Sequence, residues 1–191
     1  MLQPQDLPGR YGRAIRAIDR VLAATGAHAV LAGGWAVWRH GYVGRVTQDV
    51  DVVVGADEVS ELLRVASVSG FEVLEAPPGR WPKLHHKETG IDVDLRPEHA
   101  TPGASARPAP TPIPHPSHLG GEPGRLRYID LPALVALKLA AGRARDDSDV
   151  VELILANRSE RNAIRQYLST LHVEYERRFQ ELAIRADDQD Q

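Results

Sequence analysis

Two pairs of aspartates, each with one residue between its members, are the residues of this chain best suited to chemistry. Asp49 and Asp51 open an apolar segment that reaches residue 54, and Asp92 and Asp94 lie in the apolar segment 91–95. Side chains alternate between two faces along a β-strand, so each pair places two carboxylates on one face. Adjacent carboxylates repel each other unless a cation lies between them. A divalent metal that prefers oxygen ligands is therefore predicted at Asp49 and Asp51.

A pair of glycines precedes the first aspartates. Gly33 and Gly34 lie between an apolar segment, 28–32, and a predicted short helix near residues 35–40. Without side chains, a glycine turn can approach a ligand closely. Backbone N–H groups at the start of the helix would favour a phosphate. A plain strand-to-helix turn, which needs glycine only for its geometry, is the alternative when this pair is taken alone.

The elements that must position these residues follow from the spacing of apolar residues and from turn signals. We expect strands over 28–32, 49–54, 71–75, 81–86, 91–95 and 126–129, and helices over 11–25, 57–69, 131–141, 147–156 and 160–186. This order predicts an α+β fold with a mixed, mostly antiparallel sheet flanked by helices. The predicted core spans residues 1–129 and includes a Pro-rich loop at 97–125. A C-terminal helical segment, 130–191, is expected to pack on this core.

Length and composition exclude several classes of protein. The chain has 191 residues, 42% of them hydrophobic, and a formal net charge of −3, which gives no general argument for nucleic-acid binding. The absence of cysteine excludes disulfides and thiolate metal sites, and it fits a reducing cytosol. The N-terminus does not resemble a secretory signal, and no apolar run approaches the roughly 20 residues of a membrane span. A cytoplasmic protein without a membrane partner is expected.

Gly33-Gly34, followed by Asp49-x-Asp51 and by an acid on a later strand, resembles the nucleotidyltransferase superfamily of the DNA polymerase beta type. The segments 33–36 and 44–47 are similar to the small aminoglycoside-modifying and toxin-like branches. The resemblance implies a polymerase beta-like fold and two Mg²⁺ ions, with Mn²⁺ as a substitute, held by three carboxylates. Asp49 and Asp51 would bridge both ions. Comparison with polymerase beta implies Asp92 as the third ligand, and the toxin-like pattern implies Asp94. We place Asp92 slightly ahead and keep both.

A second block resembles nucleotidyltransferases of the abortive-infection type. It runs from Leu137 to Leu153, and the resemblance implies that Lys138 touches the triphosphate or the nucleophile while Asp146 or Asp149 orients it. The departure from the pattern is Asp147, where the family has an apolar or neutral residue. The alternative is a solvated helix end, with Lys138 on a polar face and an aspartate as N-cap.

Other polar residues have weaker patterns. Arg45 and Thr47 are candidates for phosphate contact or support of the metal-binding strand; a surface arginine and an ordinary strand residue are the alternatives. A stripe of Arg158, Arg161 and Arg165 would hold an RNA backbone or face solvent. The remaining polar candidates are histidines. We do not expect zinc at His85 and His86, because neighbouring strand residues point to opposite faces. His85 or Lys83 is instead a candidate to line a substrate pocket. We expect His115 and His118 to be solvated.

The resemblance implies a metal-dependent transfer of an NMP from an NTP, such as ATP, to a hydroxyl acceptor. A small molecule of the aminoglycoside kind and a tRNA end are both candidate acceptors, and an antitoxin is a candidate partner. The alternative is an inactive nucleotide-binding or partner-binding module with the same fold. A glycosyltransferase that uses Asp49 and Asp51 is disfavoured, because too short a segment precedes Asp49 to form a nucleotide-binding α/β domain.

Overall fold

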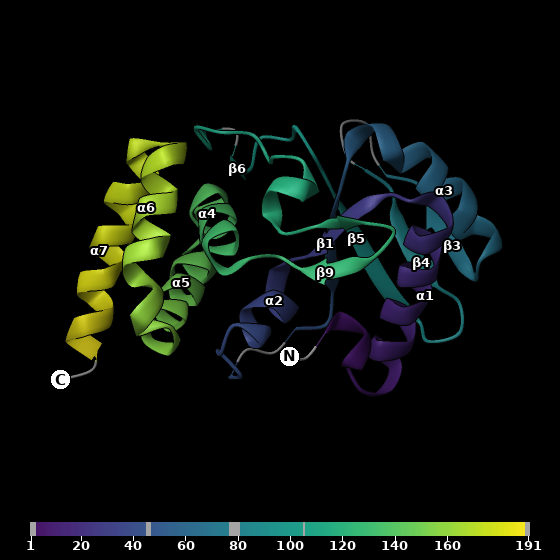
Figure 1. Cartoon of the computed structure of the whole chain (residues 1–191), viewed down its shortest axis with the longest axis horizontal. Coiled ribbons are helices and arrows are strands. Elements are labelled where there is room, and N and C mark those ends of the chain that lie inside the picture. The colour runs from purple at the N-terminus through teal and green to yellow at the C-terminus, as the bar shows by residue number, and fades with distance from the viewer. Residues whose placement is uncertain (1–2, 45–46, 77–80, 105, 190–191) are drawn as a thin grey trace. The chain divides into compact units, whose positions relative to one another are not determined.

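The computed structural model describes residues 3–44, 47–76, 81–104 and 106–189 (Figure 1). The chain forms two compact units, each assembled from segments distant in sequence. The unit we call the sheet unit contains Met1–Ala36, Val46–His99 and Pro114–Ile129. The helical unit contains Val37–Arg45, Ala100–Ile113 and Asp130–Gln191. The division of the chain predicted at residue 129 stays a prediction.

The sheet unit holds most of the strands. Its helical elements are η1 (Pro4–Asp6), α1 (Gly9–Thr25), η2 (Ala56–Glu58), α3 (Val59–Val68), η3 (Pro116–Leu119) and the start of α2 (Gly33–Arg39). Its strands are β1 (His28–Leu31), β2 (Val50–Val54), β3 (Phe71–Leu74), β4 (Lys83–His86), β5 (Ile91–Pro97), β8 (Glu122–Pro123) and β9 (Leu126–Tyr128).

The strands form a mixed sheet. One part has the order β2-β5-β4-β3 and another the order β8-β1-β9. The β2–β5 and β1–β9 pairs are parallel, whereas β3–β4, β4–β5 and β1–β8 are antiparallel. The Ala32 N–H donates to the Asp51 carbonyl oxygen at 2.9 Å, which links the end of β1 to β2. A mixed sheet flanked by helices is confirmed.

The alternation of β2 determines which residues enter the core. Val50, Val52 and Val54 are fully buried on one face of β2. Asp51 lies on the opposite face at intermediate burial, and Val53 on that face is fully buried. Helices α1 and α3 pack against each other, and α1 contacts β5. The core therefore fixes the direction in which the acidic side chains of β2 and β5 point.

The helical unit contains a short hairpin and a set of helices. The hairpin is β6 (Gly103–Ala104) and β7 (Arg107–Pro108), and the helices are α4 (Leu131–Ala141), α5 (Ala144–Ala156), η4 (Arg158–Glu160), α6 (Arg161–Leu171) and α7 (Val173–Gln189). With η3 and β8 in the sheet unit, the predicted Pro-rich loop is more structured than expected. None of the described helices has the length and apolar character required to cross a membrane.

The prediction of one continuous final helix is wrong. The backbone of His172 is extended, with φ −166° and ψ 140°, so the helix breaks there. The His172 ring Nδ1 accepts the Glu174 N–H at 3.2 Å, which satisfies a donor in the first turn of α7. Helices α6 and α7 then lie side by side (Figure 1). The helical spacing of apolar residues continues across the break because each of the two helices buries one apolar stripe.

One buried histidine makes a pH dependence of stability predictable. His86 is only 4% exposed, its Nδ1 lies 2.8 Å from the Thr89 hydroxyl, and burial lowers its pKa below the ordinary value of 6.5. Below pH 6.5 His86 binds a proton in the unfolded chain more readily than in the folded chain. The stabilisation from neutral His86 is therefore complete above that pH and is lost as the pH falls toward the folded pKa.

The His86→Gln variant is expected to lose less free energy of unfolding than the wild type between about pH 7.5 and about pH 5.5. Urea unfolding of both proteins at each pH measures this difference. An equal pH dependence in the two proteins would show that His86 is not the titrating group.

Candidate functional site

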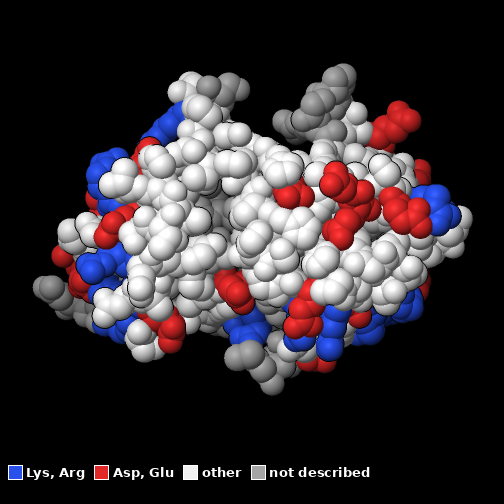
Figure 2. All heavy atoms as spheres, turned by 45° about the horizontal axis from the view of Figure 1, so that its top comes forward, with Lys and Arg blue, Asp and Glu red and all other residues white. Residues whose placement is uncertain are grey.

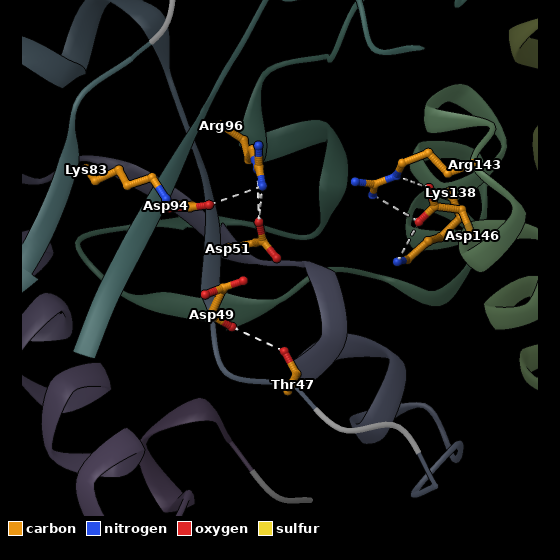
Figure 3. Close-up of polar contacts among 9 residues, drawn as sticks. All are labelled: Thr47, Asp49, Asp51, Lys83, Asp94, Arg96, Lys138, Arg143 and Asp146. Atoms are coloured by element: carbon orange, nitrogen blue, oxygen red, sulfur yellow. Dashed lines mark hydrogen bonds and ion pairs between the residues drawn. The ribbon is translucent and has the colours of Figure 1, made fainter. Parts of the chain in front are cut away.

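The centre of the candidate site is a pair of aspartates on adjacent strands. Because β2 and β5 are parallel and Asp51 is in register with Asp94, their side chains project from the same face (Figure 3). The Asp51 and Asp94 side chains are 18% and 15% exposed. Two partly buried carboxylates in register repel each other unless positive charge compensates them. Positive charge is therefore expected beside these two carboxylates.

Two basic side chains supply positive charge to this pair (Figure 3). The guanidinium of Arg96 donates to Asp51 Oδ1 from Nε at 2.9 Å and from Nη2 at 2.6 Å, and its Nη2 lies 3.4 Å from Asp94 Oδ2. Lys83 Nζ lies 2.7 Å from Asp94 Oδ1. Its bond to Asp94 is the main cause that raises the pKa of Lys83, with further contributions from the charges of Asp49 and Asp92.

The basic side chains are longer and more exposed than the acids they contact. Arg96 and Lys83 are 49% and 51% exposed, respectively, and ion pairs at such exposure contribute little to stability. The carboxylates are fixed by the sheet, whereas both long side chains can turn into solvent. A metal ion at Asp51 would have to displace the guanidinium of Arg96.

Gly33 closes one side of the pair. Its φ is +61°, and a Cβ at this position would lie 2.0 Å from Asp51 Oδ2. Only glycine leaves room for the carboxylate here, so Gly33 is required by contact as well as by backbone conformation. Gly34 is buried in the first turn of α2.

Gly33→Ala is expected to displace the Asp51 carboxylate and to lower stability by more than the roughly 1–2 kcal/mol of left-handed strain alone. Gly90→Ala is the matched control, because Gly90 has φ +67° but a Cβ added there would meet no atom within 4 Å. Urea unfolding of both variants measures the difference. Equal destabilisation would show that the contact with Asp51 is unimportant.

The other predicted acids lie around this pair rather than in it. Asp49 is exposed and directly precedes β2, where Thr47 Oγ1 lies 3.4 Å from the Asp49 carbonyl oxygen. Asp92 is 44% exposed and lies 2.6 Å from the ring Nδ1 of His85, its neighbour on β4. Asp94, not Asp92, is therefore the acid that the register places beside Asp51. Arg45 lies outside the described residues.

The aspartates do not form a tight cluster of metal ligands. Among the residues that the structure describes, three side chains with ligand atoms within 4.8 Å of one another are found at His28, Glu58 and His115 instead. His115 was expected to be solvated, but it is only partly exposed and lies beside Glu58. Nothing in the sequence indicated this cluster, because its members are distant from one another along the chain.

Lys138 lies in a buried network within the helical unit (Figure 3). Its Nζ donates to Asp146 Oδ1 at 3.0 Å and to Asp149 Oδ2 at 2.7 Å, and the Lys138 side chain is 7% exposed. Arg143 Nε also donates to Asp146, at 2.6 Å. Burial opposes ionisation of Asp146, but the bonds from Arg143 and Lys138 outweigh it and lower the pKa of this carboxyl.

This network excludes one of the two interpretations of the Lys138 block. Lys138, Asp146 and Asp149 are buried, so the block is not a solvated helix end. Asp147, the departure from the family pattern, accepts a bond from Arg178 of α7. Lys138 belongs to α4, and its bonds to Asp146 and Asp149 link α4 to α5. Its contact with a triphosphate stays a prediction.

The arginine stripe is partly neutralised by acids. Arg161 Nη2 donates to Asp187 Oδ1 at 2.7 Å, and Arg165 Nε lies 3.9 Å from Glu176 Oε1. On the face drawn in Figure 2, basic and acidic side chains are interspersed in small groups with uncharged surface between them. These contacts favour the interpretation of the stripe as an ordinary solvated helix surface.

Sequence reasoning did not identify Arg96 as a site residue, and it named Lys83 only as a candidate for a substrate pocket. Arg96 follows Asp94 by two positions on β5, so the alternation already placed the two on one face. Lys83 lies opposite Asp94 on the antiparallel β4, and this register is visible only in the folded structure.

A scan against protein-family models finds no match, and a search of curated proteins finds no similar sequence. The chain is similar in structure to ANT(2″)-Ia in complex with adenylyl-2″-tobramycin, with a TM-score of 0.48, 17% identity, and coverage of 94% of this chain and 99% of the other. A solution structure of the antibiotic-resistance factor ANT(2″)-Ia gives a TM-score of 0.45 and 16% identity, covering 93% and 92%.

The structure of JHP933 from Helicobacter pylori gives a TM-score of 0.37 and 12% identity, covering 93% of this chain and 92% of the other. The roles of individual residues therefore come from the geometry described above.

Proposed function

We propose that this protein is a metal-dependent nucleotidyltransferase that moves an NMP from an NTP to a hydroxyl acceptor. The observation that carries the proposal is the pair of Asp51 and Asp94, in register on parallel strands and packed against a glycine that admits no side chain. Such a pair costs folding free energy unless positive charge compensates it, and Arg96 and Lys83 supply that charge here. Carboxylate oxygens are the ligands that Mg²⁺ and Mn²⁺ prefer.

Asp51 and Asp94 would hold the divalent ion, and exposed Asp49 would complete its ligands at the open end of β2. A bound ion would neutralise charge on the α-phosphate and lower the pKa of the acceptor hydroxyl. We place Asp94 ahead of Asp92 as the third acid, because Asp92 precedes it on β5, away from the register position of Asp51, and is bonded to His85.

Arg96 and Lys83 have a second role in this proposal. Both now neutralise the aspartates, and both are half exposed on side chains long enough to reorient. When an NTP and its metal bind, the two cations are free to pair with phosphate oxygens instead. Gly34, Arg45 and Thr47 remain candidates for nucleotide contact.

The surroundings favour a cationic small molecule over RNA as the acceptor. Four acids, Asp49, Asp51, Asp92 and Asp94, face two bases, Lys83 and Arg96, and the charges of three of these acids raise the pKa of Lys83. The metal, Arg96 and Lys83 would compensate the phosphates of the NTP, and the remaining negative charge would attract a cationic acceptor and repel a phosphate backbone. A hydroxyl-bearing polyamine such as an aminoglycoside is therefore the acceptor class that we propose.

The proposal is tested by incubating the protein with each α-labelled NTP, Mg²⁺, and either an aminoglycoside panel or total tRNA. We expect label in a small-molecule product and none without Mg²⁺. Label in tRNA would overturn the choice of acceptor but retain the activity. If neither the small molecules nor the tRNA became labelled, but calorimetry showed that the protein binds NTP, the inactive-module alternative would be favoured.

A further inference from the structure

His28, Glu58 and His115 come together from three separate parts of the sheet unit. His28 is the first residue of β1, Glu58 the last of η2, and His115 the N-cap of η3. His28 Nδ1 lies 2.9 Å from Glu58 Oε1, and His115 Nε2 lies 3.9 Å from Glu58 Oε2. The two imidazole rings are 5.0 Å apart at 63°. Two nitrogen ligands and a carboxylate therefore converge on one point.

The protein backbone holds this cluster in place. The His28 N–H donates to Glu58 Oε2 at 2.9 Å, which fixes the carboxylate. A Cβ on Gly55 would lie 2.5 Å from Glu58 Oε2 and 2.9 Å from His115 Nε2, so the cluster packs directly on a glycine. The three side chains are 27% to 29% exposed. They are thus confined by the fold and still open to an ion from solvent.

Hydrogen bonding explains only part of the arrangement. The His28–Glu58 distance is that of a hydrogen bond, but the 3.9 Å between His115 Nε2 and Glu58 Oε2 is too long for one. His115 Nδ1 accepts the Ser117 N–H at 3.3 Å and lies 2.8 Å from the Ser117 hydroxyl. Metal binding through Nε2 requires the other tautomer, in which Nδ1 carries the proton and donates it to that hydroxyl. Such an outer hydrogen bond commonly orients a metal-binding histidine.

The distances suit a small tetrahedral ion. Zinc binds histidine nitrogen and carboxylate oxygen at about 2.0–2.2 Å, which places two ligand atoms of a tetrahedron about 3.3–3.5 Å apart. One ligand atom from each of the three side chains lies within 4.8 Å of the other two, so the side chains must rotate closer together to reach this spacing. Imidazole ligands favour zinc over Mg²⁺, which prefers oxygen.

We propose that His28, Glu58 and His115 bind one Zn²⁺ ion, with water in the fourth position. The ion would join the start of β1, the end of η2 and the start of η3. It would thereby anchor the segment that leads into β8 and β9. This site is separate from the aspartates of β2 and β5 and does not depend on the activity proposed for them.

The test is calorimetric titration of the chelator-treated full-length protein with ZnCl₂, together with its thermal unfolding. We expect one Zn²⁺ per chain and a rise in Tm. His115→Asn should weaken binding by about 100-fold or more, since even outer-shell partners contribute 10–100-fold. Glu58→Gln should act likewise. His118→Asn, which changes an exposed histidine of the same η3, is the matched control and should bind Zn²⁺ as the wild type does.

Three outcomes would overturn the proposal: no Zn²⁺ binding by the wild type, equal binding by His115→Asn and His118→Asn, or a preference for Mn²⁺ over Zn²⁺. Equal Tm values for metal-free wild type and His115→Asn would show that this variant folds. Asp51→Asn should keep its Zn²⁺ affinity, which separates this site from the proposed transfer site.

Discussion

Asp51→Asn and Asp94→Asn are each expected to reduce NMP transfer by about 1,000-fold or more, because loss of a metal ligand removes several kcal/mol of transition-state stabilisation. Both side chains are fixed on adjacent strands and face each other in register. Asparagine has the same shape as aspartate and can still accept a hydrogen bond from Arg96, so folding should be preserved. The measurement is the initial rate of label transfer, with circular dichroism as the check on folding.

Asp92→Asn is the matched control, since it removes an acid of the same strand and the same face. The register places Asp92 beside His85 rather than beside Asp51, so we expect a loss of less than about tenfold, or roughly 1.4 kcal/mol. A large loss for Asp92→Asn with a small loss for Asp94→Asn would reverse this assignment. It would restore Asp92, the residue placed slightly ahead from the sequence.

Lys138→Met is expected to lower the free energy of unfolding by about 3–5 kcal/mol, the usual cost of removing one partner from a buried ion pair. The substitution would leave Asp146 and Asp149 without their shared ammonium, and both carboxylates are almost completely buried. Methionine occupies a similar volume, so the loss reflects charge rather than a cavity. Urea unfolding measures it.

Lys87→Met provides the control, because Lys87 is exposed and its replacement should change stability by less than about 0.5 kcal/mol. If Lys138→Met were as stable as Lys87→Met but had lost NMP transfer, Lys138 would act on the nucleotide. That result would support the role implied by the family resemblance and contradict the structural role assigned here.

The fold was largely predictable because its patterns are local. Alternation of valine with aspartate identified β2 and the face on which Asp51 lies, and the same rule identified β5. Helix periodicity located α6 and α7 but not the break at His172, because an apolar stripe continues through both helices. The break depends on the conformation of one residue, which periodicity does not report.

The site was only partly predictable, since its geometry depends on strand register. The sequence showed four aspartates on two strands but could not choose between Asp92 and Asp94, which share one face. The parallel register of β2 and β5 makes that choice by placing Asp94 opposite Asp51. The cluster of His28, Glu58 and His115 could not be predicted from the sequence, because only the fold brings these three distant segments together.

The central claim is that Asp51 and Asp94 together hold a divalent cation beside a bound NTP. The most direct test is a crystal structure with Mn²⁺ and a non-hydrolysable NTP analogue, with the ion located by its anomalous scattering. We predict Mn²⁺ coordinated by the carboxylates of Asp51 and Asp94, with the Arg96 guanidinium moved from Asp51 to a phosphate. Bound nucleotide without Mn²⁺ at these carboxylates, and with Arg96 still on Asp51, would contradict the claim.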